Sequence, residues 1–138
     1  MPYLFDTDAI SEVLKRRPAR GYLRWLEAVP RQDQFTSAVS IGELYRGAFR
    51  SPNRDRHLQN IEAQILRAVT VLPYDQEVAR VYGEMAADLE SQGRRLADAD
   101  MQIAATAVHH GLELVTGNIR HFERVSRLKM NEILVQAR

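Results

Sequence analysis

The sequence predicts an α/β protein in three layers, with a central parallel sheet of four to five strands between two layers of helices. Short apolar runs alternate along the chain with longer stretches whose apolar residues recur at helical spacing. This alternation is typical of a parallel sheet whose strands are joined through helices. No repeat, low-complexity tract or Gly/Ser-rich linker divides the 138 residues, so we expect one domain over residues 1–138.

The predicted strands are short and mostly apolar. The first, PYLF at residues 2–5, ends directly at an acid, as a buried parallel strand can. The others are QFTSAVS at 34–40, VTVLPYD at 69–75, LELVT at 112–116 and a terminal strand near 128–133.

The predicted helices fill the intervals between these strands, because apolar residues there recur three and four positions apart. They cover residues 8–17, a segment around 22–26 that ends near Pro30, the segment after Ser40, 54–68, 78–93, 98–110 and a short segment near 120–125. Ser40 is the predicted N-cap of the third of these helices, which places Glu43 at the third helical position as in a capping box. Asp98 is the predicted N-cap of the helix over 98–110, and Gly111 its terminating glycine.

The composition is that of a globular protein, with 45% hydrophobic and 27% charged residues and no cysteine. The absence of cysteine excludes disulfides and thiolate metal sites and favours a reducing, cytoplasmic compartment. No apolar run approaches the roughly 20 residues that a membrane helix needs. Lys15 and Lys129 are the only lysines among 19 basic residues. Arginine suits phosphate recognition, although a GC-rich genome explains this usage equally well.

Polar residues collect where the predicted strands end. Asp6 follows the first strand, Glu43 lies in the first turn of the helix after the second, and Thr116 and Asn118 follow the fourth. Asp98 and Asp100 begin the helix that leads into the fourth strand. Ligand sites of open α/β sheets lie at the carboxyl ends of the strands, so these residues are expected to share one edge.

Several carboxylates at one edge repel each other and raise each other's pKa unless a cation neutralises them. A hard divalent ion, Mg²⁺ or Mn²⁺, fits oxygen ligands of this kind. Such an ion activates water and stabilises charge on phosphate, which suits phosphodiester hydrolysis. No histidine is placed as an obvious general base.

Each acid also has a purely structural interpretation. Asp6 could cap the next helix, although Thr7 and Asp8 could do so as well, which favours a further role for Asp6. Glu43 alone is as easily a capping-box acid or a partner for Arg46.

Asp98 and Asp100 can be separated by geometry. Residues two apart on a helix point to nearly opposite sides, so we do not expect one ion to bind both from a regular helix. Asp100 lies on the inward face with Ile103 and Ala104 and is the better ligand. Arg94 and Arg95, directly before this helix, are the best candidates for phosphate contacts.

Three segments together resemble a known family. They are LFDTDAISEVL near the start, SAVSIGELYRGA in the middle and ADADMQIAATAVHHGLELVTGNIRHFERV near the end. In order, spacing and context they are similar to the PIN-domain ribonucleases, and most of all to the VapC toxins of bacterial toxin–antitoxin pairs. The resemblance covers nearly the whole chain.

The resemblance implies an RNA-cutting enzyme that depends on Mg²⁺ or Mn²⁺, with Asp6, Glu43 and Asp100 as metal ligands. Asp100 matches the third acid because it stands three residues before the Ile103-Ala104-Ala105 element. Asp98 is then a supporting acid or part of a second metal site. The expected products carry a 5′-phosphate and a 3′-hydroxyl.

Two positions depart from the family pattern. Asn118 and His121 stand where many relatives have acids, which leaves open whether one or two ions bind. Thr7 and Thr116 would support the site by hydrogen bonding. The resemblance also implies a homodimer and a cognate antitoxin whose tail occupies the active site.

Two other functions compete with this interpretation. The DTD at residues 6–8 superficially matches the Asp-x-Asp of haloacid-dehalogenase-like phosphatases, but Ala9-Ile10 follow instead of Gly-Thr, and neither lysine has a suitable context. The second is a PIN fold that has lost its metal and only binds RNA or protein. Asp6, Glu43 and Asp100 are all present, which disfavours it.

Overall fold

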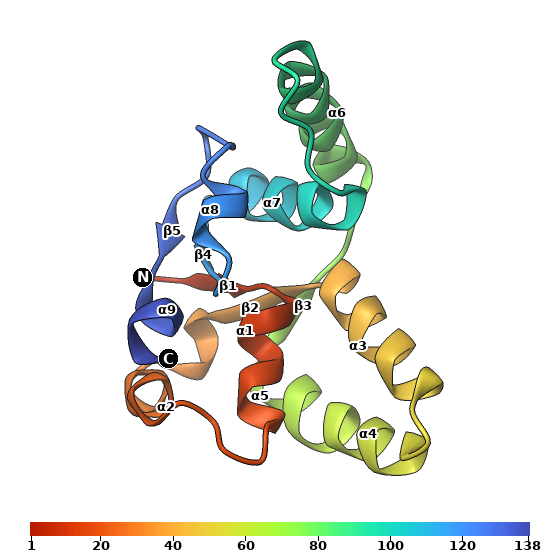
Figure 1. Cartoon of the computed structure of the whole chain (residues 1–138), viewed down its shortest axis with the longest axis vertical. Helices are drawn as coiled ribbons and strands as arrows, with labels where there is room; N and C mark the ends of the chain where they lie inside the picture. The colour runs from red at the N-terminus through yellow and green to blue at the C-terminus, as the bar shows by residue number, and fades with distance from the viewer.

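The computed structural model describes residues 1–138 and contains one sheet of five parallel strands. The strands lie in the order β3-β2-β1-β4-β5. They span Tyr3–Phe5 (β1), Gln34–Ser37 (β2), Thr70–Leu72 (β3), Glu113–Val115 (β4) and Met130–Asn131 (β5). The first strand is thus central, and the predicted parallel sheet is confirmed (Figure 1).

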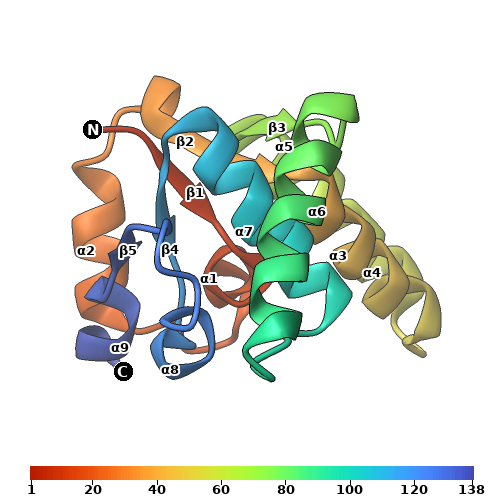
Figure 2. The ribbon, with the colours of Figure 1, turned by 90° about the horizontal axis from the view of Figure 1, so that it is seen from above.

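The helices cover both faces of this sheet. They are α1 (Thr7–Ser11), α2 (Arg20–Glu27), α3 (Ala38–Arg50), α4 (Arg54–Asn60), α5 (Leu66–Ala68), α6 (Gln76–Ser91), α7 (Asp98–His110), α8 (Ile119–Phe122) and α9 (Ile133–Ala137). Short 3₁₀ turns, η1 (Glu12–Leu14) and η2 (Arg31–Asp33), and a π-helical turn, η3 (Ile61–Ile65), complete the chain. In Figure 1, α6 and α7 lie on one side of the strands and α1, α2 and α5 on the other. Figure 2 shows α6 and α7 running side by side.

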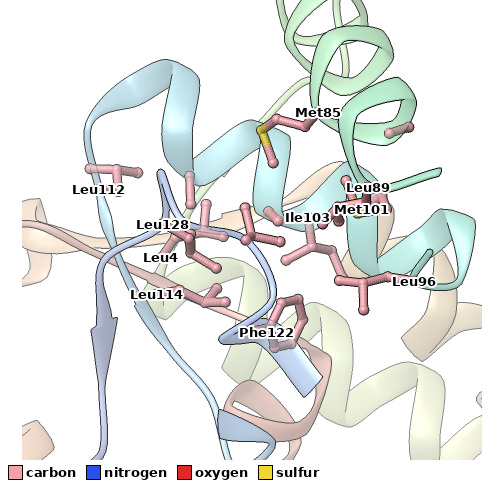
Figure 3. Packing of buried hydrophobic residues seen from close by; sticks show 14 residues of the cluster. Leu4, Met85, Leu89, Leu96, Met101, Ile103, Leu112, Leu114, Phe122 and Leu128 are labelled. Atoms are coloured by element: carbon pink, nitrogen blue, oxygen red, sulfur yellow. The ribbon is translucent and has the colours of Figure 1, made fainter. Parts of the chain in front are cut away.

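The alternation of side chains along the central strands produces two cores. Leu4 and Leu114 belong to the cluster under α6 and α7, whereas Phe5 and Val115 belong to the cluster that includes Ala9 of α1. Successive residues of a strand point to opposite faces, so each of these strands supplies both cores. Figure 3 shows the first cluster. It contains Met101 and Ile103 of α7, Leu96 from the segment before α7, and Phe122 of α8.

Several predicted boundaries were wrong. The second strand ends at Ser37 rather than residue 40, and Ser37, not Ser40, is the N-cap of α3, since its Oγ accepts from the Ser40 backbone N–H at 3.0 Å. Glu43 is therefore past the first turn and is not a capping-box acid. The first helix is shorter than predicted and passes into η1, and α9 was not predicted.

No helix is both long enough and apolar enough to cross a membrane.

Candidate active site

Four of the predicted site residues lie at the carboxyl ends of the central strands or on the helices that begin there. Asp6 directly follows β1, and Thr116 directly follows the neighbouring β4. Helix α3, which carries Glu43, begins at the end of β2 and contacts both α1 and α7. The first turn of α7 carries Asp100.

Asp6 is the most buried acid of this edge, with 5% of its surface exposed. It caps α1, because its Oδ1 accepts from the Ala9 backbone N–H at 2.8 Å. The pKa of its carboxyl is raised to about 6, because burial and the nearby charges of Asp8 and Asp100 outweigh the hydrogen bonds from Thr116 and Ala9, which lower it. Asp6 is thus both the N-cap of α1 and a buried carboxylate whose ionised form a nearby cation would stabilise.

Thr7 connects the Asp6 turn to α3. Its hydroxyl donates to Oε1 of Glu43 across 2.5 Å, a contact between residues 36 positions apart in the sequence. The Glu43 side chain is otherwise exposed. This hydrogen bond fixes one oxygen of Glu43 beside the residue that follows Asp6.

Asp100 lies beside His121. The sequence analysis did not include His121 among the candidate metal ligands. His121 Nε2 lies 2.8 Å from Oδ2 of Asp100, and both side chains are about one-third exposed or less. The N–H of His121 is not directed at this oxygen, since Nε2 is buried without a hydrogen-bond partner. The same nitrogen therefore lies close to a carboxylate oxygen and makes no hydrogen bond.

Asp98 is held away from Asp100 by other partners. Its Oδ1 accepts from the Tyr82 hydroxyl at 3.0 Å and from Arg95 at 2.8 Å. These hydrogen bonds lower the pKa of Asp98, which is largely exposed. The prediction that Asp98 is the N-cap was wrong, because Ala97 occupies that position and no side chain caps the helix.

The remaining predicted residues have different roles. The Thr116 side chain is buried and its Oγ1 accepts from the Asn118 backbone N–H at 3.0 Å, which shapes the turn into α8. The Asn118 side chain is exposed and does not cap that helix. Arg94 is exposed with no acidic partner, whereas Arg95 pairs with Asp98 and lies 3.9 Å from Glu90.

A second ionic cluster, beside the site, was missed in the sequence. Arg138 donates two hydrogen bonds to Asp8, at 2.8 and 2.9 Å, and also contacts Glu12 at 2.8 Å. Burial raises the pKa of Glu12, but hydrogen bonds from Lys15, Arg138 and the Ala19 backbone outweigh it and bring this pKa to about 2. A Cβ on Gly117 would collide with Asp8 Oδ2 and Arg138 Nη1, so the turn after β4 passes directly over this pair.

The acidic side chains at the carboxyl ends of these strands are of the type that binds a divalent ion, which would neutralise their mutual repulsion. Asp6 carries a buried carboxyl with a raised pKa, and Asp100 contributes to that shift. In this structure no three acidic or histidine side chains converge on one point closely enough to hold an ion. The side chains of Asp6, Glu43 and Asp100 therefore have to move closer together to share one ion, which the exposed Glu43 and the half-buried Asp100 can do.

Comparison with known proteins identifies the family. The model of the PIN domain matches residues 3–128. The chain belongs to the PIN-domain family. This overturns the phosphatase alternative and confirms the resemblance seen in the sequence.

Relatives and solved structures match this chain over almost its whole length. The chain is 35% identical over 129 residues to Ribonuclease VapC2 of Haemophilus influenzae, covering 94% of this chain and 96% of that protein. It is 33% identical over 132 residues to the tRNA(fMet)-specific endonuclease VapC of Shigella flexneri, covering 96% and 98% of the two chains.

Solved structures share the fold. The structure of FitAcB from Neisseria gonorrhoeae superposes with a TM-score of 0.85 at 29% identity, covering 94% of this chain and 97% of that one. DNA-bound VapBC from Salmonella typhimurium gives a TM-score of 0.88 at 27% identity, covering 95% and 97%.

Proposed function

We propose that this PIN domain, over residues 1–138, is the toxin of a toxin–antitoxin pair and acts as a divalent-metal-dependent endoribonuclease. The observation that carries the proposal is the buried Asp6 carboxyl, whose pKa is raised to about 6 by burial and by neighbouring acids including Asp100. A group in this state favours either a proton or a cation, and a metal ion is the cation that also serves RNA hydrolysis. The relatives named ribonuclease support RNA as the substrate.

Asp6, Glu43 and Asp100 would hold the ion, Mg²⁺ or Mn²⁺, through carboxylate oxygens. When bound, such an ion lowers the pKa of water and neutralises charge on the phosphate. Thr116 orients Asp6 through a hydrogen bond, and Thr7 does the same for Glu43. Hydrolysis by water leaves the 2′-hydroxyl unused, so the products would carry a 5′-phosphate and a 3′-hydroxyl.

Asp98 has a supporting role in this proposal. Its carboxylate is occupied by Tyr82 and Arg95, so we place it as the anchor of the loop before α7 rather than as a ligand. Arg94 is then the better phosphate-contact candidate of the two arginines, because Arg95 is already paired.

The partners follow from the same proposal. An antitoxin whose tail occupies the site would keep the enzyme inactive, in agreement with neighbours solved as toxin–antitoxin complexes. A homodimer is proposed as the active form. Cleavage of cellular RNA would take place in the cytoplasm, the compartment expected from the cysteine-free sequence.

The test is cleavage of total cellular RNA by the purified chain, freed of antitoxin, with Mg²⁺, with Mn²⁺ and with EDTA. Discrete fragments that require a metal, and whose new 5′ ends are phosphorylated, are the expected result. A folded protein that cleaves nothing with either ion would instead support the non-catalytic binding module.

A further inference from the structure

His121 carries the only buried side-chain nitrogen or oxygen in the chain that has no hydrogen-bond partner. This atom, Nε2, lies 2.8 Å from Oδ2 of Asp100. Buried polar atoms are nearly always satisfied, and an unsatisfied one indicates a missing water, ion or functional partner. The position of the atom beside a proposed metal ligand indicates an ion.

The fold holds the His121 ring at this place. His121 belongs to α8, whose next residue, Phe122, is 2% exposed in the core beneath α7. The two rings meet edge to face with centroids 5.6 Å apart. On the other side of the contact, Asp100 is followed by the buried Met101 of the same core cluster. Both partners are therefore attached to neighbouring buried residues (Figure 3).

The spacing between the two atoms is that of neighbouring ligands in a coordination shell. With metal–ligand distances of about 2.0–2.1 Å in octahedral geometry, adjacent ligand atoms lie about 2.8–3.0 Å apart. The observed separation of Nε2 and Oδ2 is 2.8 Å. A charged hydrogen bond has a similar length, but it would direct the His121 N–H at the oxygen, and no such bond is formed.

We propose that His121 Nε2 is a ligand of the divalent ion held by Asp6 and Asp100, and that this nitrogen makes the site prefer Mn²⁺ to Mg²⁺. Both ions suit oxygen ligands, but Mg²⁺ demands near-ideal octahedral oxygen sites, whereas Mn²⁺, as a transition-metal ion, accepts an imidazole nitrogen more readily. The proposal rests on the proposed metal-dependent function and adds the identity of one ligand and the resulting selectivity.

Pulsed electron paramagnetic resonance of Mn²⁺ bound to the full-length chain, without antitoxin, reads this ligand directly. We expect electron spin echo modulation from a coordinated imidazole ¹⁴N in the wild type. The coupling should disappear in His121→Gln and change as expected for ¹⁵N when the wild type is labelled with ¹⁵N-histidine. His109→Gln, at the far end of α7, is the matched control and should retain it.

Calorimetric titration with Mn²⁺ and with Mg²⁺ tests the selectivity. His121→Asp, which makes the site all oxygen, should lower the ratio of Mn²⁺ to Mg²⁺ affinity about tenfold, or about 1.4 kcal/mol. Mn²⁺ bound to the wild type without ¹⁴N coupling would overturn the assignment of His121 alone. A wild-type protein that binds neither ion would overturn the metal-dependent function as well, so the two failures are distinguishable.

Discussion

At the scale of single residues, the carboxyl of Asp6 has two roles. It caps α1 through the Ala9 N–H and is also the buried acid of the site. The cap hydrogen bond favours the charged form, but burial outweighs it and raises the pKa to about 6. Without a metal, the ionised Asp6 is therefore a source of instability.

The pH dependence follows from this shift. The pKa of Asp6 rises from 3.8 unfolded to about 6 folded, so the unfolded state loses its proton first as the pH increases. In EDTA, the free energy of unfolding should fall between about pH 4 and pH 6, by roughly 2–3 kcal/mol from this residue. Asp6→Asn removes the charge and should flatten this part of the curve, measured by urea denaturation at several pH values.

Asp75→Asn is the control for the capping role. Asp75 caps α6 in the same way, accepting from the Val78 N–H at 3.0 Å, but is less buried than Asp6. Its replacement should leave the pH dependence of stability close to that of the wild type. Equal curves for wild type and Asp6→Asn would contradict a raised pKa at Asp6.

At the scale of elements, the ion pair between Asp8 and Arg138 joins α1 to the end of α9, and the turn after β4 crosses it at Gly117. This turn also carries Thr116, which hydrogen-bonds Asp6. These three segments, which are far apart in the sequence, therefore support the candidate active site.

Gly117→Ala tests this arrangement. The added Cβ would collide with Asp8 Oδ2 and Arg138 Nη1, so the ion pair must shift. We expect a loss of about 0.5–1 kcal/mol in the free energy of unfolding, because the displaced atoms are the ends of a partly exposed ion pair. Gly83→Ala, in open space within α6, should instead increase it by up to about 1 kcal/mol.

A double-mutant cycle separates the ion pair from other causes. In an Arg138→Gln background the Asp8 side chain is freed, so Gly117→Ala should cost distinctly less than in the wild type. The same cost in both backgrounds would show that the collision with this pair is not what Gly117 avoids.

The elements differ in how far the sequence predicts them. The five strands and the long helices follow from local periodicity, because their apolar residues must face the sheet. Helix α9 was missed because Ile133–Ala137 is too short for a period to be recognised. The partnership of Arg138 with Glu12 joins residues 126 positions apart, and local pattern holds no signal for it.

The site was predicted unevenly for the same reason. The places of Asp6 and Asp100 in the fold could be predicted because strand ends and helix starts are visible in the sequence. Asp98 was taken for a cap because Tyr82, 16 residues earlier, could not be known to compete for its carboxylate. His121 was noted only as a departure from the family pattern, although a polar residue directly before the buried Phe122 was a usable signal.

At the scale of the whole molecule, the net charge of +1 hides an uneven distribution of arginines near the site. Arg46 and Arg50 are exposed on α3 without an acidic partner, three and seven residues after Glu43. This spacing places all three on one face of the helix. An RNA strand at Glu43 would therefore pass free guanidinium groups.

Single Arg46→Gln and Arg50→Gln variants should raise KM for RNA without a comparable change in kcat. Each should also reduce the slope of log KM against log salt by about 0.7–0.9, the value for one lost phosphate contact. Arg31→Gln is the control and should match the wild type, because Arg31 precedes β2 and lies at the amino end of the strand, opposite the candidate site. Salt slopes equal to the wild type in both α3 variants would exclude this face as the RNA track.

The assignment of Asp100, not Asp98, to the metal is tested most directly by paired cleavage assays of Asp100→Asn and Asp98→Asn on total RNA with Mn²⁺. Asp100 faces His121 and lowers the stability of ionised Asp6, whereas Asp98 is bound to Tyr82 and Arg95. We expect Asp100→Asn to lose at least 100-fold in rate, about 2.7 kcal/mol, and Asp98→Asn to lose less than tenfold. A folded Asp98→Asn variant that is inactive beside an active Asp100→Asn variant would contradict the account.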